Sequence, residues 1–84
     1  MKTENETKNR PVHKIEVETI VAAIWANKAK YTAGMLYSVR ITRRYPVAGT
    51  WRETPSFGVD ELPLVAKAAE LAREWILNAQ ALEN

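Results

Sequence analysis

The sequence of 84 residues contains no cysteine, one histidine and three glycines. Without cysteine the fold cannot rely on disulfides or on a thiolate zinc site, and His13 alone supplies too few ligands to hold a metal. No serine nucleophile stands in a recognisable catalytic context, and three glycines do not make a glycine-rich phosphate loop. We therefore expect no catalytic residues, no metal site and no cofactor, and predict that the chain is not an enzyme.

Long apolar runs are also lacking. Residues 1–10 alternate charged and polar side chains and have no apolar stretch of the kind found in signal peptides. We therefore expect a cytoplasmic location and no membrane association. The composition, 46% hydrophobic and 26% charged, is typical of a globular protein, and the length suits one domain.

Alternating apolar and polar residues predict three strands, at residues 15–27, 35–45 and 50–57. The first is apolar in both parities, which indicates a strand covered on both faces or one bent near Thr19. In the second, Tyr37 and Ile41 share one face while Arg40 and Arg44 share the other. Residues 1–14 have little to bury and are predicted to form a flexible basic and polar arm.

Apolar residues at three-and-four spacing predict a C-terminal helix over residues 61–81, with Asp60 as its N-cap. Pro55 predicts that the third strand lies at a sheet edge, because proline cannot donate to a ladder. The expected fold class is α+β, with residues 15–84 forming one domain. We expect a three- to four-stranded antiparallel sheet covered on one face by a single C-terminal helix.

Large aromatic side chains are candidates for the core. Trp51 and Phe57 share a parity, so at least one of them is expected to anchor the helix against the sheet. Trp75, on the helix, is expected to lie in a core or a dimer contact. Trp25 has two possible roles: packing, which is the commoner use of tryptophan, or stacking against a ligand.

Charge is distributed unevenly. Residues 27–52 contain six bases and no acid, whereas residues 60–84 contain five acids and two bases. A basic sheet face suits phosphate, which arginine binds through paired donors. The candidate nucleic-acid-binding residues, for DNA or RNA, are Arg40, Arg44, Arg52, Arg43, Lys28, Lys30 and Trp25. Arg40, Arg44 and Arg52 are assigned to phosphates, and the lysines and Arg43 to the rim. Arg52, Thr54 and Ser56 are expected to lie on the same face as Arg40 and Arg44.

Two other interpretations remain open. Arginines and threonines on an exposed sheet face also serve simply to keep that face soluble. Alternatively, the apolar part of the face, with Val21, Ala23 and Leu36, or the helix flank, forms a protein-interaction or homodimer surface. The salt dependence of binding distinguishes nucleic-acid binding from such an interaction surface, because phosphate binding weakens steeply with salt and apolar association does not.

Four stretches carry a family resemblance: IVAAIWAN (20–27), YSVRITRRY (37–45), WRETPSF (51–57) and DELPLVA (60–66). Together they resemble a group of short, uncharacterised bacterial proteins, which implies no particular activity. The order of strands followed by one helix also resembles two DNA-binding designs. These are the PC4 and Whirly type, which holds single strands on a sheet, and the AP2 or integrase-arm type.

Overall fold

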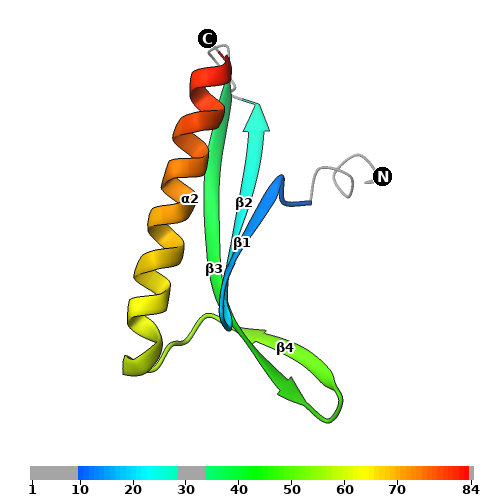
Figure 1. Ribbon diagram of the computed structural model, residues 1–84. Helices are drawn as coiled ribbons and strands as arrows, with labels where there is room; N and C mark the ends of the chain where they lie inside the picture. The colour runs from blue at the N-terminus through cyan, green and yellow to red at the C-terminus, as the bar shows by residue number, and fades with distance from the viewer. Residues whose placement is uncertain (1–9, 29–33, 84) are drawn as a thin grey trace, which may run out of the picture.

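The computed structural model describes residues 10–28 and 34–83, which form a four-stranded antiparallel sheet and a C-terminal helix. The strands are β1 (His13–Val17), β2 (Ile20–Lys28), β3 (Met35–Val47) and β4 (Thr50–Thr54), and they lie in the order β1-β2-β3-β4. A short 3₁₀ turn, η1 (Val59–Glu61), leads into α2 (Leu62–Glu83). The helix covers one face of the sheet (Figure 1). The predicted α+β class is therefore confirmed.

The first predicted strand is in fact two strands joined by a tight turn at Glu18 and Thr19. Glu18 has a positive φ of 56°, which reverses the chain so that β1 and β2 pair with Val17 opposite Ile20. This turn explains the apolarity of both parities, because the register places odd-numbered residues of β1, such as Ile15, on the same face as even-numbered residues of β2, such as Ala22. Strand β1 begins at His13, so its first two residues belong to the sheet and not to the predicted arm.

The core lies between β2 and α2. Fully buried side chains on the helix side of β2 meet two alanines of α2, and these five residues are Ile20, Ala22, Ile24, Ala68 and Ala72. Small side chains on the helix allow it to approach the sheet closely. Phe57 and Trp75 pack against this cluster, which confirms both predictions, and the Trp75 ring stacks on His13 with 4.9 Å between centroids.

The start of the helix differs from the prediction. Gly58, and not Asp60, is the cap residue, and its N–H donates to Oε1 of Glu61 at 2.5 Å. Asp60 and Glu61 lie in the first turn of η1, where negative charge is favourable. In the described part of the chain, no helix is long and apolar enough to cross a membrane.

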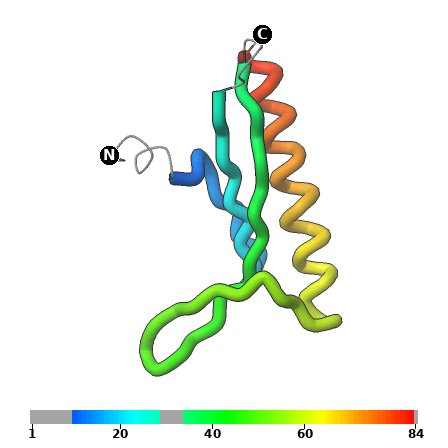
Figure 2. The backbone as a smooth tube through the Cα atoms, turned by 180° about the vertical axis from the view of Figure 1, so that it is seen from behind, coloured from blue at the N-terminus to red at the C-terminus, as the bar shows by residue number. Residues whose placement is uncertain are grey.

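The second half of β3 and all of β4 form a hairpin that extends away from the helix (Figures 1 and 2). Its turn is Ala48 and Gly49, with φ of 50° and 85°, the pair of positive values that a two-residue turn of a twisted hairpin requires. Strand β4 ends at Thr54, three residues earlier than predicted and just before Pro55. β4 lies at the sheet edge, as Pro55 predicted.

Candidate functional site

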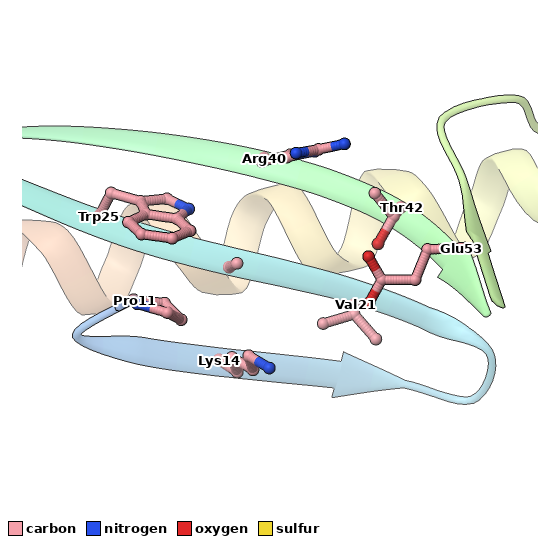
Figure 3. Close-up of a pocket in the computed structure, with 8 residues that line it drawn as sticks. Pro11, Lys14, Val21, Trp25, Arg40, Thr42 and Glu53 are labelled. Carbon is pink, nitrogen blue, oxygen red and sulfur yellow. The ribbon is translucent and has the colours of Figure 1, made fainter. Parts of the chain in front are cut away.

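The sheet face opposite α2 carries a shallow hollow of about 260 Å³ (Figure 3). We call this face the open face. Eight residues line the hollow: Pro11, Lys14, Val21, Ala23, Trp25, Arg40, Thr42 and Glu53. They come from the segment before β1 and from all four strands, so the whole sheet builds the site.

Strand register explains why the hollow forms. Lys14 is opposite Ala23, and Ala23 is opposite Arg40, so these residues form one row across three strands. Neighbouring strands lie about 4.8 Å apart, which separates the backbones of the two cations by about 10 Å. Because Ala23 has only a methyl group, the space between Lys14 and Arg40 stays empty.

Apolar and polar groups complete the hollow around that row. The next row along the sheet contains Val21 and Thr42, which are almost fully buried although they lie on the open face. On the other side, the half-buried Trp25 presents its ring beside the hollow (Figure 3). Trp25 therefore lies on the open face, outside the helix–sheet core.

Acids on the open face neutralise part of its charge. Arg44 donates to Oε1 of Glu16 across 3.4 Å, and the register places Glu53 directly opposite Arg44. The Arg44 guanidinium also lies over the Trp51 ring, 5.9 Å from its centroid. In contrast, neither Lys14 nor Arg40 forms a salt bridge within the described residues. These two cations are the ones best placed to receive an anionic ligand.

Several candidate residues lie away from the hollow. Arg52 is opposite Tyr45, so it lies on the face opposite Arg44, and the prediction that the two share a face is wrong. Thr54 lies opposite Arg43, so the prediction that Thr54 shares the face of Arg40 and Arg44 is wrong for the same reason. Lys28, opposite Met35, belongs to the helix-side parity of β2. Lys30 lies outside the described residues.

Arg43 has a local role. Its Nε lies 3.4 Å from the carbonyl oxygen of Ser56, to which it donates, and 3.8 Å from Oε1 of Glu61. Its guanidinium lies 5.7 Å from the centroid of the Tyr45 ring. These contacts connect β3 to the start of the helix segment, so Arg43 is engaged in the fold and not at the rim of the hollow.

Sequence reasoning missed three residues that line the hollow: Pro11, Lys14 and Glu53. The first two were assigned to the N-terminal arm. The alternation of His13, Lys14, Ile15, Glu16 and Val17 is the signal that could have revealed a strand with Lys14 on its polar face. Glu53 could have been found only with the register of the β3–β4 hairpin in hand.

On the helix side, the structure perturbs one titrating group. The Tyr37 hydroxyl donates to Oε2 of Glu83 at 2.5 Å. This hydrogen bond, and after it desolvation and the negative charge of Glu83, raise the pKa of Tyr37 above its ordinary value of 10.0. Elsewhere in the described segments, no three potential metal ligands lie close enough together to hold an ion.

Comparison with known proteins finds no family model that matches the chain, and no curated protein or solved structure that is significantly similar to it.

Proposed function

We propose that this chain is a non-catalytic nucleic-acid-binding protein that holds a single strand on its open face. The observation that carries the proposal is the hollow in which a half-buried tryptophan ring lies beside two cations that form no salt bridge in the described structure. A base stacks on Trp25, and the flanking phosphates contact Arg40 and Lys14. A cytoplasmic location, predicted from the sequence, belongs to the same proposal.

Physical chemistry favours a single strand over a duplex at this site. A base must leave its own stack before it can lie on a protein ring, and unpaired bases do so at low cost. Stacking on an aromatic side chain contributes about 1–3 kcal/mol per base and tolerates any sequence. The row Lys14, Ala23 and Arg40 places one positive charge on each side of the hollow, where a backbone crossing the strands would pass.

The proposal is tested by fluorescence anisotropy of labelled single-stranded and duplex oligonucleotides at several salt concentrations. The wild type is expected to bind the single strand more tightly, with affinity falling as salt rises. The variant Lys14→Ala/Arg40→Ala should flatten the slope of log affinity against log salt by about 1.4, because each single-strand phosphate contact contributes about 0.7. Trp25→Ala should weaken binding by about 5- to 150-fold, which corresponds to about 1–3 kcal/mol of stacking.

The matched control is Arg52→Ala/Lys67→Ala. This variant removes the same amount of charge, but Arg52 lies off the open face and Lys67 lies on α2. It should retain the salt slope of the wild type. Absence of binding at low salt, or equal losses in both double variants, would contradict the proposal.

A second candidate function is a protein-interaction or homodimerisation module, without nucleic-acid binding. One observation favours it: an apolar groove of about 320 Å³ lies between β3 and α2. Association through such a surface should persist at high salt, whereas phosphate binding should not.

A further inference from the structure

Part of strand β3 has a free edge. Strand β4 pairs only with Arg43–Val47, so within the described residues nothing pairs with the outer edge of residues 35–42. The N–H of Arg44 donates to the carbonyl of Thr19 at 2.8 Å, toward the β2 side. Because antiparallel bonds alternate along a strand, odd-numbered residues of this segment, such as Tyr37 and Val39, turn their N–H and C=O groups outward.

This edge lacks the features that protect other sheet edges. Proteins blunt exposed edges with short strands, charged side chains, prolines or bulges. Strand β1 is five residues long and carries Lys14 and Glu16, and β4 is equally short and carries Arg52 and Glu53. The eight residues of β3 from Met35 to Thr42 contain one charge and no proline. Of the described edges, this one is the most open to pairing.

An apolar groove runs beside the same edge. Val39 and Ile41 of β3 line it together with Ala69, Ile76, Leu77 and one charged residue, Arg73, of α2. Val39 is 38% exposed and Leu77 is 46% exposed, so these apolar side chains of the groove are open to solvent. A partner that pairs with β3 would therefore also cover these side chains.

We propose that a second copy of this chain occupies the edge, with the two β3 strands paired antiparallel about a twofold axis perpendicular to the sheet. A free edge is complementary to itself under this symmetry. The outward-turned, odd-numbered residues of one copy then pair with odd-numbered residues of the other. The helix-covered faces of the two sheets therefore lie on the same side of the joined sheet. Both helices then flank the junction, and each groove faces the other copy.

Charge and core size both favour this occupant. In registers centred on Ser38 or Val39, Arg40 lies opposite Leu36 or Ser38 of the partner subunit and never opposite a second arginine. The described core is also small, since three of its five clustered residues are alanines, and the sequence has no cysteine to reinforce it. Small folds of this kind are commonly supported by oligomerisation. The inference does not depend on the proposed nucleic-acid function.

The test is sedimentation velocity over a wide concentration range, up to the millimolar. The wild type should sediment at twice the monomer mass. Val39→Pro removes an outward N–H that β2 does not use, and Leu77→Lys replaces an apolar side chain of the groove by a second cation beside Arg73. Each should shift the protein to monomer while the far-UV circular dichroism stays that of the folded chain.

Leu82→Lys is the matched control, because Leu82 is 87% exposed and lies outside the groove. It should remain a dimer. Loss of the dimer in Leu77→Lys but not in Leu82→Lys supports the proposal even if Val39→Pro fails to fold. A monomeric wild type, an assembly larger than a dimer, or a dimer that survives Leu77→Lys would overturn it.

Discussion

Shortening Ile24 should destabilise the fold severely. Its side chain is fully buried on the helix side of β2 and is one of the two largest fully buried side chains in the described residues. Replacing it with alanine removes three carbons, which at about 0.8 kcal/mol each costs about 2.4 kcal/mol before the cavity is counted. The cavity brings the expected loss to about 3–4 kcal/mol. For a domain of this length the whole stability is about 4–13 kcal/mol.

Urea unfolding followed by far-UV circular dichroism measures this loss. Ile24→Val should cost about 1 kcal/mol, and Leu82→Ala, at an exposed position, should cost less than about 0.5 kcal/mol. All variants must be compared at one protein concentration, because self-association adds a concentration-dependent contribution. A loss below about 1 kcal/mol for Ile24→Ala, or an equal loss for Leu82→Ala, would refute the assignment of the core to the β2–α2 contact.

Three further predictions concern single contacts. The raised pKa of Tyr37 means that its hydrogen bond to Glu83 stabilises the fold below pH about 10, and that this stabilisation is lost as pH rises through the raised pKa. Glu83→Ala should return the pKa of Tyr37, followed by ultraviolet absorbance, toward about 10. An unchanged midpoint would contradict the assignment. Glu18 has a φ of 56°, so Glu18→Asn, which tolerates that conformation, should raise the unfolding free energy by about 0.5–1 kcal/mol, and a loss would show that the turn is unstrained. Arg43→Ala should cost at most about 1 kcal/mol, because its ion pair with Glu61 is partly exposed. Glu61→Ala should cost more in the same urea assay, because Gly58 also loses its acceptor, and equal losses would argue against that cap.

Much of the fold could be predicted from local patterns. The helix boundaries follow from apolar spacing, and the alternation of β3 correctly separates Tyr37 and Ile41, on the helix side, from Arg40 on the open face. The turn at Glu18 was only partly predicted, as a bend near Thr19. No glycine, asparagine or proline marks that turn, and a glutamate at positive φ is uncommon. The pattern alone therefore could not show that one long segment was two strands.

The candidate site was harder to predict because it depends on register. The β3–β4 pairing joins even-numbered with odd-numbered residues, so Arg44 is opposite Glu53 and Arg52 is opposite Tyr45. A shift of one residue in a hairpin exchanges the two faces of a strand, and the sequence does not specify where the turn begins. The expected partner Arg52 therefore lies off the open face, whereas Lys14, which was assigned to the N-terminal arm, lies on it.

The hairpin that extends beyond the helix has a consequence for how the molecule opens. Within its paired segments, Arg43–Val47 and Thr50–Thr54, no residue is fully buried, and the helix does not cover them. Segments with few buried contacts open locally at free energies far below that of global unfolding. Amide hydrogens in this hairpin should therefore exchange with solvent by its separate fraying, while those of β2 should exchange only when the whole molecule unfolds. We therefore expect the hairpin and β2 to behave as distinct cooperative units within one continuous sheet.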